Sequence, residues 1–510
     1  MNRLKTRVLP AALALCVLAL PACDNFGDLN TDPTQASQID PNFKLTNIQL
    51  RISGERYENW RTNLIYSSTM MQHLAALPGY WSGDKYFLNV GYSASMWERY
   101  YPNISKNIED LRLQVCEDPE TADEMVNMCA ITRITRVVMY HRLTDLYGDV
   151  PYSQAGLGIV DGIVKPAYDP QQEIYADMLN ELQEAAASLD ASKPSFGGGD
   201  LIYQGDVEKW RKFANSMMLR LGFRLIERDP GAAQQWVERA IAGGVMESND
   251  DIAFVPHDPN AWRNGVGEVF LADDNQHMSE TFVTFLQDRN DPRLTVFGQV
   301  PVAGAPAVGL PNGNDADTIV DDDSWIPCGD NPDAAPSPCG MDVYMNVNPE
   351  MVGVEDPMIF QTYAEVEFML AEAAIRGWGA SGANGHYEAG VRAAMDHLSL
   401  YGAAVSSDAI DSYVAADTFD ESDADALEQI ANQYWVATFL NEYETFANWR
   451  RTGFPDLTPV DFPGNVTGGT IPRRMIYSPN ESVTNEENYN AAVARQGPDL
   501  LTTRVWWDAN

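Results

Sequence analysis

The feature that most constrains the fold is a recurrent spacing of apolar side chains, three or four residues apart, in several separate segments. The spacing occurs in residues 174–189, 213–226, 362–378, 387–398 and 427–437. It gathers the apolar residues on one side of a segment only when that segment is an α-helix, and that side then faces a core. The sequence therefore predicts a mostly α-helical protein.

Two of these segments form a pair around a short turn. Between 362–378 and 387–398 the chain reads "WGASGANG", whose glycines favour a tight reversal. The small residues of "AEAAIRGWGASGANGHYEAG" would let two antiparallel helices approach closely. This helix–turn–helix pair resembles a degenerate tetratricopeptide unit, although the sequence shows only a weak repeat.

Long segments without periodicity separate the helices. Residues 244–278 and 298–356 are dense in Gly, Pro, Asp and Asn. Unstructured segments of this length in a folded protein are usually functional or disordered. We therefore expect one helical domain, residues 41–510, with irregular loop insertions near these two segments.

The N-terminus has the layout of an export signal. A basic start and an apolar run from Val8 to Leu20 precede Ala22 and Cys23. The run is shorter than the roughly 20 residues that span a bilayer as a helix, which argues against a transmembrane anchor. "LPAC" resembles the lipobox of bacterial lipoproteins, in which the cysteine is acylated and becomes the first mature residue.

Three predictions follow for this end of the chain. Residues 1–22 are a lipoprotein signal peptide, Cys23 is the lipidation site, and residues 23–40 are a flexible tether. The tether prediction rests on the abundance of Asp, Asn, Thr and Pro, which leaves little to bury. The alternative is a plain signal peptide followed by a chance cysteine.

The chain is strongly acidic. Its 73 Asp and Glu residues against 34 Lys and Arg give a formal net charge of −39. Nucleic-acid binding needs basic side chains that neutralise phosphates, so we exclude nucleic acid as a partner. The apolar content of 45% is that of an ordinary globular protein, and a sizeable core is therefore expected.

Four of the six cysteines fall in two close pairs. An exported chain reaches an oxidising compartment, where such cysteines form disulfides. Four cysteines allow three connectivities. We predict the local one, in which Cys116 pairs with Cys129 and Cys328 pairs with Cys339.

The order of motifs along the chain resembles that of the SusD/RagB family of nutrient-binding outer-membrane lipoproteins. Each motif alone is weak, but their succession is specific and runs almost from end to end. The matching pieces are "CDNFGDLNTDPTQA", "MWERYYPNI", "RLTDLYGDVPYSQA", "YDPQQEIYADMLNELQEA", "GDVEKWRKFANSMMLRLGFRL", "NDPRL", "TYAEVEFMLAEAAIRGW", "NWRRTGFP", "IPRRMIYSPNE" and "TRVWWD".

The resemblance implies both a fold and a function. The fold would be tetratricopeptide-like helical pairs in a right-handed superhelical scaffold, with a long-looped, irregular ligand-binding face. The protein would be a lipid-anchored outer-membrane protein that faces the cell exterior. It would capture oligosaccharide or peptide nutrients and deliver them to a SusC-like TonB-dependent transporter, with no catalysis and no cofactor.

Sugar binding needs flat aromatic faces beside polar side chains, so loop aromatics are the candidate ligand contacts. Tyr80, Trp81 and Tyr86 lie in a Gly-rich loop, Trp262 lies beside Arg263 and Asn264, and Trp325 follows three aspartates. The alternative for each of these five aromatics is packing in the interior or incidental exposure.

Other polar residues have a structural and a functional interpretation. Asp315, Asp317 and Asp321 could supply oxygen ligands to Ca²⁺, but the stretch lacks the EF-hand pattern, and a solvated acidic loop is the preferred interpretation. Ion pairing with internal carboxylates, Glu365 or Glu372 for example, is the expected role of the arginines Arg450, Arg451, Arg473 and Arg474, with ligand contact as the alternative.

A search for catalytic motifs finds no HExxH, no GxSxG, no P-loop and no GxGxxG. Paired carboxylates discriminate nothing in a chain so rich in them. The rival functions are a secreted α-helical glycoside hydrolase or lyase, and a structural surface protein without a small ligand.

Overall fold

The computed structural model describes residues 39–158, 160–329, 338–422 and 424–509. The predicted signal peptide, Cys23 and nearly all of the predicted tether lie outside the described residues. Everything below concerns the compact unit Pro41–Asn510.

The described chain is mostly helical, as predicted, and its strands are short. The helices are α3 Pro41–Ser53, α4 Arg56–Glu58, the π-helix η1 Asn59–Ser68, α5 Val90–Ser93, α6 Ser95–Tyr100, the π-helix η3 Tyr101–Ser105, α7 Lys106–Cys116, α8 Val126–Tyr147, α9 Gln171–Ser188, α10 Val207–Arg224, α11 Pro230–Gly243, α12 Gly265–Phe270, α13 Glu280–Asp288, α14 Leu294–Phe297, α15 Tyr363–Arg376, α16 Ala383–Asp396, α17 Ser407–Ala416, α18 Ala426–Ala437, α19 Glu442–Thr452, α20 Glu481–Thr484 and α21 Glu486–Gln496. Three antiparallel strand pairs join β1 Leu74–Ala76 to β3 Gln276–Met278, β2 Ala253–Val255 to β6 Met358–Gln361, and β4 Gly298–Gln299 to β5 Asn346–Val347.

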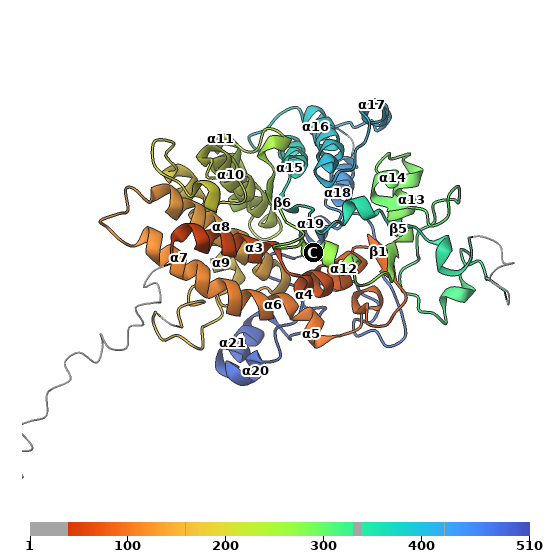
Figure 1. Cartoon of the computed structure of the whole chain (residues 1–510), viewed down its shortest axis with the longest axis horizontal. Helices are drawn as coiled ribbons and strands as arrows, with labels where there is room; N and C mark the ends of the chain where they lie inside the picture. Colours follow the sequence, from red (N-terminus) through yellow and green to blue (C-terminus); the bar gives the residue numbers. More distant parts are fainter. Residues whose placement is uncertain (1–38, 159, 330–337, 423, 510) are drawn as a thin grey trace, which may run out of the picture. The chain divides into compact units, whose positions relative to one another are not determined.

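Successive helices pack side by side and form the scaffold (Figure 1). Helix α8 packs on α9, α9 on α10, and α10 on α11, while α15 contacts α10, α16 and α18. The five segments with helical spacing correspond to α9, α10, α15, α16 and α18, so those predictions are confirmed. The two loop-rich segments hold only short strands and short helices.

The pair α15 and α16 shows how the sequence specifies a helical hairpin. Thr362 and Glu365 form a capping box at the start of α15, and Gly377 ends the helix in the left-handed region at φ 71°. On α16, Gly390 meets the ring of Phe368 so closely that an added Cβ would lie 2.7 Å from Cε1. A larger residue at this position would push the two helices apart.

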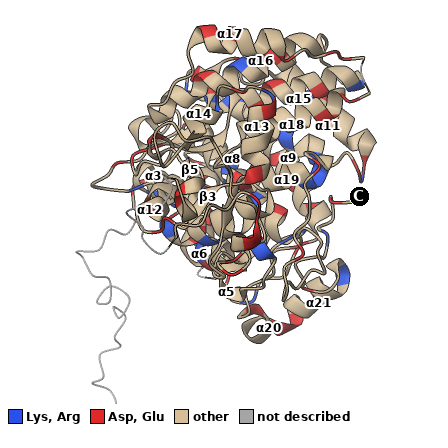
Figure 2. Cartoon of the chain, turned by 90° about the vertical axis from the view of Figure 1, so that its right-hand side faces the viewer, with Lys and Arg blue, Asp and Glu red and all other residues tan. Residues whose placement is uncertain are grey.

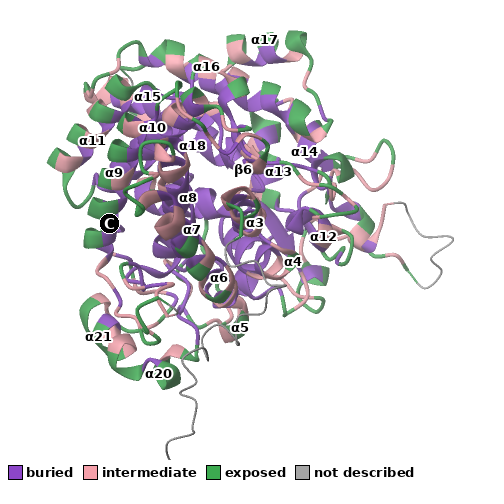
Figure 3. Cartoon of the chain, turned by 60° about the vertical axis from the view of Figure 1, so that its left-hand side comes forward, coloured by how far each residue is buried: buried purple, intermediate pink, exposed green. Residues whose placement is uncertain are grey.

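The core is centred on α8. From Ala130 onward nearly every residue of this helix is buried, polar ones included. Figure 3 shows buried residues along α8 and α18, and exposed ones on outer helices such as α16, α17 and α21. A helix buried on all sides must satisfy its polar side chains inside the protein.

A network of buried charged side chains supplies these partners. On α10, Arg220 binds Glu365 of α15 (Nη2–Oε2 2.6 Å) and Glu444 of α19 (Nε–Oε2 3.4 Å). One turn later, Arg224 binds Glu444 (Nη2–Oε1 2.7 Å) and Asp145 of α8 (Nε–Oδ2 3.6 Å). The network therefore joins four helices that are distant in the sequence.

Aromatic donors complete the network. The hydroxyl of Tyr434 lies within hydrogen-bond distance of the carboxylates of Glu365 (2.9 Å) and Glu444 (2.8 Å) and can donate to either. Asp145 accepts hydrogen bonds from the hydroxyl of Tyr175 and from Nε1 of Trp507 (3.1 Å). The bond from Trp507 ties the C-terminal segment to α8.

The arginines predicted to pair with internal carboxylates mostly do so. The pairs are Arg451 with Glu372 (2.9 Å), Arg473 with Asp508, and Arg474 with Asp499 (3.1 Å). Arg450 differs, because it donates to the backbone carbonyls of Asp145 (2.7 Å) and Arg473 (3.0 Å). The structure thus favours the structural interpretation for all four arginines.

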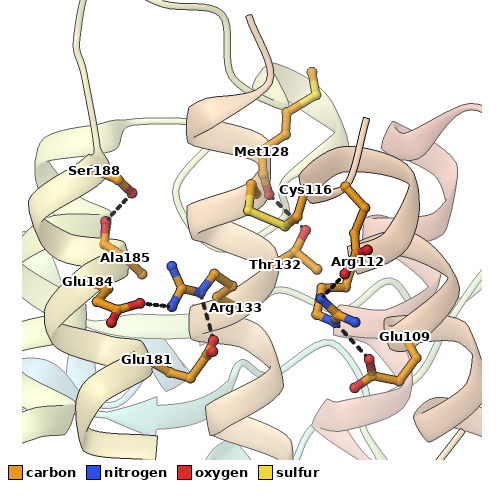
Figure 4. The surroundings of a disulfide bond; sticks show 12 residues. Glu109, Arg112, Cys116, Met128, Thr132, Arg133, Glu181, Glu184, Ala185 and Ser188 are labelled. Atoms are coloured by element: carbon orange, nitrogen blue, oxygen red, sulfur yellow. Dashed lines mark hydrogen bonds and ion pairs between the residues drawn. A yellow bond between two sulfur atoms is a disulfide. The ribbon is translucent and has the colours of Figure 1, made fainter. Parts of the chain in front are cut away.

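Both predicted disulfides are present, with the local pairing. Cys116–Cys129 joins the end of α7 to α8, and Cys328–Cys339 closes a loop. Figure 4 shows the first of them beside Arg133 of α8, which binds Glu181 (2.7 Å) and Glu184 (2.6 Å) of α9. These contacts hold α7, α8 and α9 together at one end.

Replacing Glu444 by Gln should destabilise the fold strongly. The change removes the carboxylate that bridges two buried guanidinium groups, so Arg220 keeps only Glu365 and Arg224 keeps only the more distant Asp145. Breaking buried ion pairs in this way costs about 3–5 kcal/mol. Burial raises the pKa of Glu444, but Arg220 and Arg224 outweigh it and hold the value at about 2, against 4.5 ordinarily. The pair therefore stabilises the fold above pH 4.5, and this contribution is lost as the pH falls towards 2.

Urea unfolding of the wild type and of Glu444→Gln at several pH values would test this expectation. The variant should have a lower midpoint at neutral pH and a flatter acid dependence. The control is Glu388→Gln, which removes an exposed carboxylate of α16 and should change the midpoint little. Equal midpoints for the wild type and Glu444→Gln would show that the network does not support the fold.

Candidate ligand-binding site

A large hollow lies in the irregular region. We call it the loop cleft. It has a volume of about 920 Å³ and is lined by residues from the segments 77–78, 270–277, 341–347 and 349–355. Its wall mixes apolar side chains with carboxylates and amides, which is the composition of a small-molecule site.

A second hollow, which we call the arginine groove, has a volume of about 850 Å³. It lies where α4, the start of η1, α6 and α12 meet, and α4 and α12 run beside each other (Figure 1). Its wall includes Tyr57, Trp60 and Trp262, together with Arg56, Arg61, Arg99 and Arg263.

One buried carboxylate connects the two hollows. Asp273 lines the loop cleft, and its Oδ2 accepts hydrogen bonds from Trp60 (Nε1, 3.2 Å), Tyr80 (hydroxyl, 2.9 Å) and Trp81 (Nε1, 3.2 Å). Its Oδ1 accepts from the side chain of Asn275 at 2.7 Å. Three aromatic rings are thereby held in fixed orientations around a single side chain.

Two titratable groups beside the cleft keep their neutral forms at neutral pH. Burial, with the adjacent carboxylate of Asp273, raises the pKa of Tyr80 to about 12. Burial lowers the pKa of His277, which lines the cleft, to about 4. The charges on the cleft wall therefore come from its aspartates and glutamate.

The loop that carries Tyr80 is folded tightly against η1. Gly83 lies so close to the backbone of η1 that an added Cβ would be 2.3 Å from the carbonyl oxygen of Ile65. The next residues form a buried ion pair, Asp84 with Lys85 (2.8 Å), and Asp84 also accepts from Asn312 (2.6 Å). This part of the loop faces the interior.

The structure corrects two of the predicted ligand contacts. Trp81 is fully buried and Tyr86 is 1% exposed, so neither ring presents a face to a ligand. Both flank the stretch around Gly83 that is seated against η1 and faces the interior. Trp81 instead supports the site through its hydrogen bond to Asp273. Tyr80, 38% exposed, is the aromatic of this loop that a ligand can reach.

The other two predicted aromatics lie in different places. Trp262 is half-buried in the wall of the arginine groove, where the guanidinium of Arg51 lies 5.6 Å from its ring. Trp325 is half-buried against a small second core that contains Leu310 and Tyr344. Trp262 therefore forms part of the arginine-groove wall, and Tyr80 borders the loop cleft through its hydrogen bond to the lining residue Asp273. Trp325 lines neither hollow.

The carboxylates predicted as alternative calcium ligands are used locally. Oδ1 of Asp315 accepts hydrogen bonds from the backbone nitrogens of Asp317 and Thr318, both at 3.0 Å. Over the residues that the structure describes, no group of three or more His, Cys, Asp or Glu side chains could hold a metal ion. Asp315, Asp317 and Asp321 are thus not gathered into a calcium site.

Several residues of the two hollows were not predicted from the sequence. Arg56 with Trp60, and Tyr57 with Arg61, stand four residues apart and therefore share a helical face, a signal that "ERYENWR" contains. Asp273 carries no comparable signal, because its three aromatic partners come from elsewhere in the chain.

The comparisons with known proteins agree with this architecture. The profile of one family, described as SusD-like, starch-binding and associating with the outer membrane, matches residues 33–478. The chain belongs to the SusD-like family. A search of the curated proteins found no match.

Solved SusD-like structures resemble the chain over nearly its whole length. A chitin-binding protein is 36% identical with a TM-score of 0.82, and the match covers 92% of this chain and all of that one. A chitin-binding SusD homologue from Flavobacterium johnsoniae is 25% identical, with a TM-score of 0.77 and coverage of 92% and 98%. A SusD homologue from Bacteroides uniformis has the same identity and TM-score, with coverage of 92% and 99%.

None of the described helices is long and apolar enough to cross a membrane.

Replacing Asp273 by Ala should loosen the site and lower stability. The buried indole N–H of Trp81 loses its acceptor, which costs about 1–3 kcal/mol. Denaturant unfolding would measure the loss, and tryptophan fluorescence would report the altered surroundings of Trp60 and Trp81. The neighbouring exposed Asp274 provides the control, since Asp274→Ala should shift stability by less than about 0.5 kcal/mol. Indistinguishable unfolding curves for the two variants would contradict the anchoring role of Asp273.

Proposed function

We propose that this SusD-like protein captures oligosaccharides at the outer membrane and delivers them to a SusC-like TonB-dependent transporter. The observation that carries the proposal is the loop cleft, whose border holds aromatic rings oriented by Asp273. The family description names starch, and the 36% identical relative is a chitin-binding protein, which supports a carbohydrate rather than a peptide ligand.

The geometry supplies the two kinds of contact that a sugar needs. The exposed ring of Tyr80 can stack on the apolar face of a pyranose. Around it, Asp274, Asn275 and Asn346 place carboxylate and amide groups in the cleft wall for hydroxyl groups of the ligand. Because Asp273 fixes Tyr80 before binding, little ordering entropy is lost when the sugar arrives.

The proposed activity is binding without cleavage, so the ligand leaves unchanged. The rival function, a glycoside hydrolase or lyase, predicts that the protein cleaves the glycan. Incubation of the pure protein with chitohexaose and maltoheptaose should release no new chain ends. New ends that disappear when one cleft carboxylate is replaced would support the rival and contradict the proposal.

In this proposal the N-terminal segment determines where in the cell the protein is located. Acylation of Cys23 would anchor the protein in the outer membrane, facing the cell exterior, and residues 24–40 would serve as the tether. Each buried CH₂ of an acyl chain contributes about 0.8 kcal/mol, so more than one chain holds a protein stably at a bilayer. The tether would let the loop face approach the mouth of the transporter.

Replacing Tyr80 by Ala should weaken binding of chitohexaose or maltoheptaose, whichever the wild type binds, about tenfold. Loss of one stacking ring is worth roughly 1.4 kcal/mol, which corresponds to that factor. Isothermal titration calorimetry would measure it. Phe43→Ala is the control, since Phe43 is 73% exposed on α3 and lines neither hollow. An unchanged affinity of Tyr80→Ala would remove the loop cleft from the proposed function.

Replacing Cys23 by Ala in the full-length chain should abolish membrane anchoring. The protein should move from the detergent phase to the aqueous phase in a Triton X-114 partition, because no acyl chain is attached. Cys16→Ala offers a matched control: Cys16 lies within the predicted signal peptide, so this variant should stay in the detergent phase. Detergent partitioning of Cys23→Ala would refute lipidation at this cysteine.

A further inference from the structure

The arginine groove differs in charge from the rest of the molecule. The chain carries a formal net charge of −39, and Figure 2 shows Asp and Glu on many of its elements. In contrast, the wall of the arginine groove holds four arginines and only two carboxylates, those of Glu55 and Glu268. The groove is therefore a local excess of positive charge on an acidic protein.

These four arginines also lack the carboxylate partner that most other arginines of the described chain have. Across the described residues, no carboxylate lies within the 4.0 Å ion-pair distance of Arg56, Arg61, Arg99 or Arg263. The nearby Arg51, by contrast, pairs with Glu55 at 3.2 Å. In a chain with 73 carboxylates, four neighbouring unpaired guanidinium groups leave a cluster of donors available to an anion.

Aromatic rings position three of the four guanidinium groups. Tyr57 has the guanidinium of Arg61 at 3.8 Å and that of Arg99 at 4.4 Å from its ring centre. The guanidinium of Arg56 lies 4.9 Å from the ring centre of Trp60. A guanidinium stacked on a ring is ordered in advance and keeps N–H donors at its edge, where carboxylate and sulfate bind in a bidentate manner.

The remaining acidic groups near the groove weaken this charge only in part. Glu98 is engaged by the hydroxyls of Tyr57 (3.4 Å) and Ser478 (3.3 Å). Burial raises the pKa of Glu58 to about 7, so this carboxyl carries only part of a negative charge at neutral pH. Two of the groove arginines use one donor each within the protein: Arg61 donates to the backbone carbonyl of Tyr57 (3.1 Å) and Arg263 to that of Pro259 (2.8 Å).

The groove and the loop cleft share a boundary. Trp60 forms part of the groove wall, and its indole donates to Asp273 in the cleft wall. Helix α12 also contributes to both, with Glu268 on the groove side and Phe270 on the cleft side. The two hollows therefore adjoin each other across Trp60 and α12.

We propose that the arginine groove binds the carboxylate or sulfate groups of an acidic oligosaccharide. The inference rests on the proposed function and specifies its substrate class: an anionic glycan rather than a neutral one. Stacking on Tyr80 would hold one sugar unit, and the arginines would select the charged substituents of the next ones.

The test compares glycans that differ only in charge. Affinity electrophoresis of the full-length protein in mild detergent would use polygalacturonate against its fully methyl-esterified form, and dextran sulfate against dextran. We expect at least tenfold tighter binding to a charged member than to its uncharged match, with a loss of binding at high salt. Chitohexaose, maltoheptaose and poly-glutamate complete the set of probes.

The variants separate the groove from the fold. The double change Arg56→Gln and Arg263→Gln alters two exposed side chains and should weaken charged-glycan binding at least tenfold while the unfolding midpoint stays the same. Arg239→Gln on α11 is the matched control. Arg239 is exposed, unpaired within the described chain and 4.7 Å from the ring of Trp236, yet outside both hollows, so binding should not change.

Each outcome decides between the two proposals. Equal binding of charged and uncharged matches, with chitohexaose or maltoheptaose bound, would overturn the acidic-glycan inference and leave the proposed function intact. Arginine-dependent binding of poly-glutamate without charged-glycan binding would reassign the groove to acidic peptides. Failure of every glycan to bind would overturn both proposals.

Discussion

A cluster of paired charges inside the helical scaffold is the interaction on which the rest of the structure depends. Arg220 and Arg224 of α10 are enclosed with Glu365 of α15, Glu444 of α19 and Asp145 of α8. Ions removed from water are tolerated only when each has a close, hydrogen-bonded partner, so these helices can assemble in few ways. Apolar stripes alone would permit helices to slide along one another. We infer that the buried pairs fix their register.

The scaffold matters for function because it brings irregular segments together and holds them. Strand β1 pairs with β3, two hundred residues away along the chain, and this pairing sets the loop of Tyr80 beside the segment of Asp273. The aromatic rings of the site are then oriented by hydrogen bonds to one carboxylate. Loops on a rigid frame can vary in sequence without disturbing the core, which suits a family whose members share a fold but differ in ligand.

The aromatic loop shows how far sequence reasoning reaches within a site. A Gly-rich stretch with Tyr80, Trp81 and Tyr86 is correctly singled out as unusual, but composition does not say which rings face solvent. In the structure Gly83 is seated against the backbone of η1 and Trp81 is buried, whereas Tyr80 stays exposed. Conversely, the arginines and aromatics of "ERYENWR" have a helical spacing that is visible in the sequence. A helical face of this kind is commonly part of a core. Only the fold shows that this one borders a hollow.

By itself, the sequence determined the features that depend on near neighbours in the chain, namely the helices over 174–189 and 362–378 and the local disulfides. It also indicated the SusD-like family, through the order of motifs along almost the whole chain. The tertiary structure alone decided which carboxylate each buried arginine meets, which aromatics remain exposed, and that Asp273 joins Trp60 and Tyr80. The physical reason is that these contacts join residues that lie far apart in the sequence, some of them more than two hundred positions. Their partners are selected by packing, and a periodicity read along the chain carries no information about distances across it.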